Sequence, residues 1–160
     1  MDTLQSLTST FAHPGSVEWI GVRPARMQPL RMLESVNAVE SLGLEGDRYA
    51  SPGGNRQVTL IQAEHLQTVA DLLGLGEVDP GLTRRNIVVR GLNLVALKGK
   101  RFRIGEALLE YTGPCDPCSR MESNLGKGGY NAMRGHGGIT ARVLRGGKIK
   151  LGDAVEPEAG

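Results

Sequence analysis

The sequence predicts a mainly β fold: a closed or partly closed β-barrel of short, mostly antiparallel strands with a few small helices. Glycine accounts for 23 of the 160 residues, about twice its usual share of roughly 7%, which favours many tight turns. Between these turns lie about eight or nine short runs that resemble strands, many of them β-branched. Clear helical periodicity occurs in one segment. Many short strands with little helix are typical of a barrel.

The strand candidates follow one another along most of the chain. We expect strands at Val17–Val22, Arg31–Val39 (broken by Asn37), Gln57–Ile61, Asn86–Val89, Leu94–Leu97, Arg101–Ile104 and Ala107–Thr112. Two further strands, Ile139–Leu144 and Lys148–Leu151, are expected to form a hairpin around Gly146 and Gly147.

The clearest helix is predicted at Ala63–Leu73, where apolar residues recur three and four positions apart and Gly74 supplies a stop. The first 15 residues are expected to be an N-terminal extension, either a short docking helix or a frayed end. Residues 16–156 then form one barrel domain, since 160 residues correspond to a single domain.

The composition excludes several classes of protein. Hydrophobic residues make up 39% and charged residues 22% of the chain, which is typical of neither a disordered nor a membrane protein. No apolar run approaches the roughly 20 residues that span a bilayer, and the N-terminus lacks the basic and apolar regions of a signal peptide. The net charge of +2 argues against bulk nucleic-acid binding. We therefore expect a cytoplasmic protein with no membrane or nucleic-acid partner.

The two cysteines occur together, in the segment Gly113-Pro114-Cys115-Asp116-Pro117-Cys118-Ser119-Arg120. Local rules predict a turn at Gly113-Pro114, followed by a helix with Asp116 as its N-cap and Pro117 at its first position. Cys118 would then lie in the first helical turn, where backbone N–H groups favour the thiolate. Cys118 is therefore the better candidate for a nucleophile or a metal ligand, while Cys115 precedes the helix.

Three interpretations of this C-x-x-C segment compete. A redox dithiol fits the strand-turn-helix setting but lacks the βαβ pattern of thioredoxin-like proteins. A structural zinc site needs two more ligands, and the three histidines of the chain stand at unsuitable spacings. Two cysteines packed in a core fit poorly with the surrounding proline, aspartate, serine and arginine.

Arginine supplies 14 of the 19 basic residues, and it is the side chain suited to bidentate capture of phosphate or carboxylate. Three polar clusters lie in loops rich in glycine or at strand entries, where arginine forks and backbone N–H groups can hold an anion: Glu45–Arg48, Arg84–Asn86 and Arg134–Gly138. Neither a P-loop nor a dinucleotide-binding glycine motif is present, which argues against the nucleotide-binding folds.

Taken in order, several motifs together resemble the MOSC domain, named after the C-terminal domain of molybdenum cofactor sulfurases. The motifs are Gly43–Arg48, Arg56–Ile61, Asn86–Val89, Arg103–Glu110 and Pro117-Cys118. The resemblance runs from about Val17 to Val155 and identifies a stand-alone, single-domain member. The fold of that family is a β-barrel with small helices, in agreement with the strand pattern.

The resemblance implies a cofactor role for Cys118, which follows Pro117 as the family's cysteine does. That cysteine is proposed to ligate molybdenum bound to a pterin, or to bear sulfane sulfur, and a thiolate suits both tasks. As an enzyme, the protein would reduce N-hydroxylated substrates with electrons from a partner protein. As a carrier, it would accept sulfur from a donor protein.

The implied cofactor is the anionic molybdenum cofactor (molybdopterin), and no pyridoxal phosphate is expected on this chain. The resemblance gives cofactor-binding roles to Asp47, Arg48, Arg56, Arg85, Asn86 and His136. Exposed barrel edges would allow a homodimer. The alternative is a thiol redox or structural module in which Cys115 and Cys118 form a disulfide and no cofactor binds.

Overall fold

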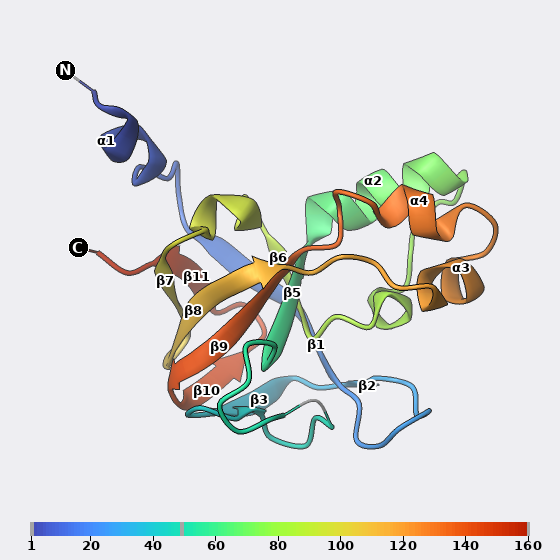
Figure 1. The fold of residues 1–160 in the computed structure, drawn as a ribbon, viewed down its shortest axis with the longest axis horizontal. Coiled ribbons are helices and arrows are strands. Elements are labelled where there is room, and N and C mark those ends of the chain that lie inside the picture. The colour runs from blue at the N-terminus through green and yellow to red at the C-terminus, as the bar shows by residue number, and fades with distance from the viewer. Residues whose placement is uncertain (1, 49, 160) are drawn as a thin grey trace.

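The computed structural model describes residues 2–48 and 50–159, and its centre is a closed barrel of seven short strands (Figure 1). The strands are β1 (Gly15–Val22), β5 (Val58–Gln62), β6 (Ile87–Arg90), β7 (Arg101–Ile104), β8 (Ala107–Pro114), β9 (Ile139–Arg145) and β11 (Ala154–Pro157). They are ordered β11-β7-β8-β9-β5-β6-β1, and pairing of β1 with β11 closes the ring. All neighbours are antiparallel except β5 and β6. The expected barrel is confirmed.

The parallel pair β5–β6 is connected by helix α2 (Ala63–Leu73), because parallel neighbours require a crossover. The helix has the bounds that its periodicity predicts, and Gly74 ends it in the left-handed conformation, with φ of 71°. Leu66, Val69 and Ala70 form its buried face. Strands β5 and β6 are therefore covered on both sides, by the barrel core and by α2.

Two apolar clusters reflect this layering. The larger fills the barrel and includes Leu60, Ile87, Phe102 and Leu109. The smaller lies outside the barrel, where Ile61 and Val88 pack beneath α2, α3 (Arg120–Leu125) and α4 (Gly129–Met133). In Figure 1 these three helices gather on one side of the barrel, away from the N-terminal helix α1 (Leu4–Thr8). Within residues 2–48 and 50–159, no helix combines the length and apolar character needed to cross a bilayer.

The prediction of a hairpin around Gly146 and Gly147 is wrong. Strand β10 (Gly147–Lys150) instead pairs with β3 (Ser35–Val39), which also pairs with β4 (Gly43–Leu44), to form a separate three-stranded sheet. The physical reason is that β9 already pairs with β5 on one edge and with β8 on the other. No edge of β9 remains for β10.

Two other expectations are corrected. Leu94–Leu97 forms a 3-10 helix, η2, rather than a strand, because Leu94 and Leu97 are both buried while Val95 is exposed, which suits a spacing of three. The expected strand Arg31–Val39 is two strands, β2 (Arg31–Met32) and β3. The interruption falls at residues 33–34, whereas Asn37 lies within β3 and pairs with Lys148. A further short helix, η1 (Pro80–Thr83), precedes β6.

The start of β9 gives a test of how tightly the barrel is packed. Gly138 has φ of +87°, and a Cβ there would overlap the Leu60 carbonyl oxygen of β5. Gly135, in the same loop, has φ of +79° but open space where a Cβ would lie. Gly138→Ala should therefore cost about 2 kcal/mol more free energy of unfolding than Gly135→Ala, which carries only the backbone strain of about 1 kcal/mol. Urea unfolding of both variants measures this, and equal losses would contradict it.

Candidate functional site

A cavity of about 520 Å³ lies where several loops meet at the ends of β1, β5 and β6. We call it the arginine pocket. It is lined by Arg23, Arg26, Met27, Arg48, Arg56, Thr59, Arg84, Arg85, Asn86, Cys118 and Arg120. These residues come from segments as far apart as positions 23 and 120, so the fold brings them together. Its volume is within the range of small-molecule sites.

The electrostatic character of the pocket is strongly positive. Seven of the lining residues are arginines, and among the described residues that line it none is acidic. Guanidinium groups form paired hydrogen bonds with phosphate and carboxylate oxygens, and several in one concave site repel each other unless an anion is bound. The pocket is therefore suited to an anionic ligand.

Arg85 forms the inner wall of the pocket and is only 2% exposed. Its Nε donates to the Gly137 carbonyl (2.8 Å) and its Nη1 to the Thr83 carbonyl (2.8 Å). Its Nη2 donates to the carbonyls of Cys115 (2.9 Å) and Asp116 (3.3 Å). Burial lowers the pKa of the Arg85 guanidinium from its usual value, and Cys115 opposes that change. Arg85 thus holds the cysteine segment in place.

Asn86 has a similar structural role at the start of β6. Its Oδ1 accepts hydrogen bonds from the Thr59 backbone N–H (3.1 Å) and hydroxyl (3.2 Å). Its Nδ2 donates to the Gly21 carbonyl (3.0 Å). Asn86 therefore connects β1 with β5 beneath the pocket, and both ends of its amide are already bonded to the protein.

The cysteine segment differs from the helix expected at Pro117. Helix α3 begins at Arg120, with Ser119 as its N-cap, so Cys118 precedes the helix instead of lying in its first turn. The reason is that Arg85 binds the carbonyls of Cys115 and Asp116, and the Cys115 N–H donates to the Gly138 carbonyl (2.9 Å). These contacts hold the segment in a non-helical conformation.

The two cysteines have opposite environments. Both thiols are free; Cys118 is exposed and lines the arginine pocket, whereas Cys115 is buried. Burial raises the pKa of the Cys115 thiol, although Arg85 and Arg56 oppose this change. Cys118 is therefore the thiol that a ligand in the pocket can reach.

The candidate site residues from the sequence divide into two groups. The arginine pocket brings together Arg48, Arg56, Arg85, Asn86 and Cys118. Asp47 and His136 are not among its lining residues. The Asp47 Oδ1 accepts a hydrogen bond from the Arg23 backbone N–H (2.9 Å) next to the pocket.

His136 lies against α2 instead. Its Nδ1 is 2.9 Å from the Ala132 carbonyl oxygen, and its ring is 5.1 Å from that of His65 in an edge-to-face arrangement. Partial burial and His136 together lower the pKa of His65. The loop Arg134–Gly138 is expected from the sequence to hold an anion. In the structure its Gly137 carbonyl accepts a hydrogen bond from Arg85, and its Gly138 carbonyl accepts one from the Cys115 N–H.

The residues that the sequence did not single out are Arg23, Arg26 and Met27, together with Thr59, Arg84 and Arg120 from segments that it did. The one signal for the arginines among them was the high share of arginine, 14 of 19 basic residues. That signal shows that arginine is abundant, but not which arginines meet at one pocket. Their meeting depends on where each loop leaves the barrel.

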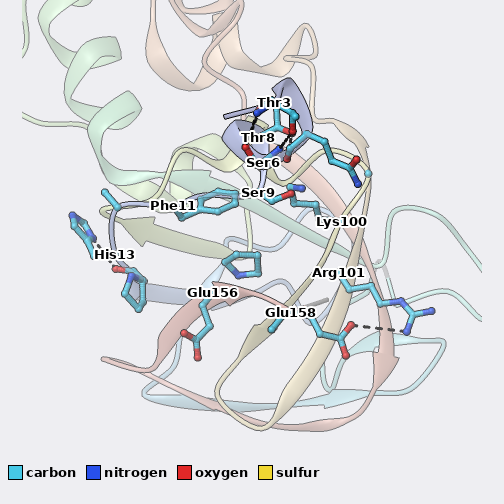
Figure 2. Close-up of a pocket in the computed structure, with 16 residues that line it drawn as sticks. Thr3, Ser6, Thr8, Ser9, Phe11, His13, Lys100, Arg101, Glu156 and Glu158 are labelled. Carbon is cyan, nitrogen blue, oxygen red and sulfur yellow. Dashed lines mark hydrogen bonds and ion pairs between the residues drawn. The ribbon is translucent and has the colours of Figure 1, made fainter. Parts of the chain in front are cut away.

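A larger cavity, of about 1220 Å³, lies between the N-terminal segment, the start of β7 and the end of β11 (Figure 2). Residues of mixed character line it, including Ser6, Phe11, His13 and Lys100, with Arg101 4.0 Å from Glu158. One wall is α1, which has no buried residues. Both cysteines lie elsewhere, so the arginine pocket is the stronger candidate for chemistry.

The structure predicts how the two thiols react. In the native protein at neutral pH, iodoacetamide should label Cys118 and leave Cys115 unlabelled, because Cys115 is buried and its raised pKa keeps the thiol protonated. Arg85→Met should increase labelling of Cys115 at least about tenfold by loosening the segment.

Arg90→Met is the matched control, since Arg90 also forms a forked contact, with Glu18, but on the surface. Peptide mass spectrometry gives the labelling rates. Equal rates for Cys115 in the two variants would show that Arg85 does not hold the segment.

Comparison with solved structures shows the same fold in other proteins. The YUAD protein from Bacillus subtilis superposes with a TM-score of 0.79 and 21% identity, over 92% of this chain and 97% of that one. YiiM from Escherichia coli gives a TM-score of 0.71 and 22% identity, over 92% and 71% of the two chains. YiiM from Geobacillus stearothermophilus gives 0.73 and 19%, over 91% and 76%. The comparison with curated proteins gives no match.

The sequence itself matches a family model. The match covers residues 45–156, from the loop that carries Arg48 to the last strand of the barrel, and the description of that model is the MOSC domain. It includes Arg56, Arg85, Asn86 and Cys118, but not the β1 end of the pocket. The match spans well over half of the chain, and the chain belongs to the MOSC domain family.

Proposed function

We propose that this protein binds the molybdenum cofactor in the arginine pocket, with Cys118 as the metal ligand, and reduces N-hydroxylated substrates with electrons from a partner protein. The observation that carries the proposal is that the exposed Cys118 thiol shares one cavity with seven arginines. A soft sulfur ligand and a set of guanidinium groups are what a metal bound to an anionic pterin requires. The family to which the chain belongs is associated with this cofactor.

The residues present fit such a group. Among the described residues, no three His, Cys, Asp or Glu side chains gather to hold a metal ion by themselves. A metal at Cys118 would therefore take its other ligands from a bound cofactor, and a phosphorylated pterin carries both the ligand atoms and the negative charge. When bound, the cofactor would supply the two-electron redox chemistry.

The chain's own residues would bind and orient the ligand. Arg48 and Arg56 are exposed and line the pocket, so their guanidinium groups are suited to bind a phosphate there. Arg85 and Asn86 would act as positioning residues. Arg85 would position Cys118 through its hydrogen bond to the Asp116 carbonyl, and Asn86 would support Thr59, which lines the pocket, by accepting a hydrogen bond from it. Reduction of an N-hydroxyl group to an amine and water consumes two electrons and two protons, which the partner protein and solvent would supply.

The first test compares the two cysteines. Cys118→Ala should abolish molybdenum retention in protein produced with molybdate, whereas Cys115→Ala should retain most of it, since only Cys118 lines the pocket. Metal analysis by inductively coupled plasma mass spectrometry gives the content per chain, and near one per chain is expected for the unaltered protein.

Other outcomes of this experiment identify the alternatives. A persulfide mass increase on Cys118 without metal would indicate the sulfur carrier, in which the Cys118 thiolate attacks the terminal sulfur of a donor persulfide and the donor thiolate leaves. Equal losses of function in both cysteine variants, with a Cys115–Cys118 disulfide in the purified protein, would indicate the thiol redox module.

The second test addresses the positive charge of the pocket. Arg56→Gln should weaken the binding of inorganic phosphate about fivefold, because one exposed ion pair contributes up to about 1 kcal/mol. Arg145→Gln is the matched control, since Arg145 is exposed on β9 and does not line the pocket. Isothermal titration calorimetry at low salt gives the affinities, and raising the salt concentration should reduce the difference. Equal affinities in the two variants would contradict an anion site at Arg56.

A further inference from the structure

A second cavity, of about 570 Å³, adjoins the arginine pocket. The two share Arg23, Met27, Arg84 and Arg120, which form a common wall. Beyond this wall the second cavity is lined by Trp19, Gln28, Pro29, Leu30, Met32, Asp79, Gly81, Leu82 and Asn124. We call this cavity the apolar groove.

The groove presents large apolar side chains to solvent. Met27, Met32 and Leu82 are 72%, 63% and 41% exposed. Trp19 is half-buried, and its ring lies against the backbone of β1. The contact is so close that a Cβ on Gly21 would overlap the Cη2 atom of the ring. Gly21 therefore makes room for the indole, which offers an aromatic surface at the groove. Such a surface is suited to a flat ring.

Two features distinguish the shared wall: a long contact between Arg120 and Met27, and backbone in the left-handed region. The Arg120 Nη1 and Nη2 atoms lie 3.9 and 4.0 Å from the Met27 sulfur. Three non-glycine residues have positive φ among those the structure describes, and two of them, Met27 (67°) and Arg84 (60°), lie in this wall. Strained backbone of this kind clusters at ligand sites, where the surrounding structure maintains it.

We propose that the apolar groove is a second ligand subsite, which binds a planar apolar group of a small molecule whose anionic group lies in the arginine pocket. The continuity of the two cavities through Met27, Arg84 and Arg120 carries the inference. It rests on the proposed function only in requiring that the arginine pocket binds anions. The site would therefore select amphiphilic aromatic anions over simple anions.

Charge complementarity favours a small anion over a second copy of this chain in the groove. A symmetric interface would place the same residues opposite each other, and the groove carries three arginines, Arg23, Arg84 and Arg120, against one carboxylate, Asp79, in each copy. Bringing like charges together without an anion is unfavourable. An aromatic anion instead pairs its charge with the arginines and its ring with the apolar side chains.

The test compares phenyl phosphate with inorganic phosphate, using the full-length chain produced in cells that cannot make the pterin cofactor. Phenyl phosphate should bind at least about tenfold more tightly, because its ring leaves water for the groove. The affinities come from isothermal titration calorimetry. The chain contains one tryptophan, Trp19, so phenyl phosphate should also shift the tryptophan emission whereas inorganic phosphate should not.

Leu82→Ser should abolish most of the gain for phenyl phosphate and leave the affinity for inorganic phosphate unchanged. Leu151→Ser is the matched control, since Leu151 is also 41% exposed but lies outside the groove. It should retain the full gain. Met32→Ser, at another exposed position in the groove, repeats the test should Leu82→Ser fail to fold.

Four results would overturn the proposal. Equal affinities for the two phosphates would refute the groove as a subsite and leave the arginine pocket intact. A gain that survives both Leu82→Ser and Met32→Ser would place the ring elsewhere. Tryptophan emission that depends on protein concentration, without ligand, would show a second copy in the groove. Failure of both phosphates to bind would refute the groove proposal and, separately, the anion site of the proposed function.

Discussion

The buried fork of Arg85 is the interaction on which the rest of the site depends. One guanidinium donates to carbonyls of Thr83, Gly137, Cys115 and Asp116, which belong to three separate segments. Removing the side chain would leave buried carbonyls without donors, and such groups are costly to leave unpaired. Burial lowers the pKa of Arg85, but its hydrogen bonds to the Cys115 and Asp116 carbonyls still hold the guanidinium and the cysteine segment together. Lysine, with one point charge, could not reproduce this fork.

The arrangement around Arg85 explains why two neighbouring cysteines differ. The segment is bonded through the Cys115 N–H and carbonyl, which turns Cys115 inward, and α3 starts only at Arg120. Cys118 is left between this anchor and the helix, exposed at the pocket. The parallel pair β5–β6 supplies the floor, because Thr59 and Asn86 bond across it. A rigid floor and one accessible thiol beneath clustered arginines are the physical basis of the proposed cofactor site.

Local patterns predicted those parts of the fold that local physics decides. Helix α2 is found where its apolar period predicts it, and β7 has the predicted bounds, since Phe102 and Ile104 alternate with exposed or half-buried arginines. Predictions failed where a segment's partner decides its structure. Leu94–Leu97 has an apolar composition that suits a strand, yet it forms a 3-10 turn that buries Leu94 and Leu97. Likewise β10 has the sequence of a hairpin arm, but both edges of β9 were already paired.

The same division holds for the candidate site. The sequence by itself predicted the barrel class and the bounds of helix α2, because apolar spacing is a local property. It also singled out Cys118, through its place after Pro117 and through an expected position in a first helical turn, which the structure does not have. Tertiary structure alone decided which arginines converge, since Arg23 and Arg26 carry no local mark that separates them from Arg145. It also decided that His136 lies against His65 and that Arg85 binds carbonyls. Convergence is set by the directions in which loops leave a closed barrel, and those directions depend on strand pairings between residues distant in sequence.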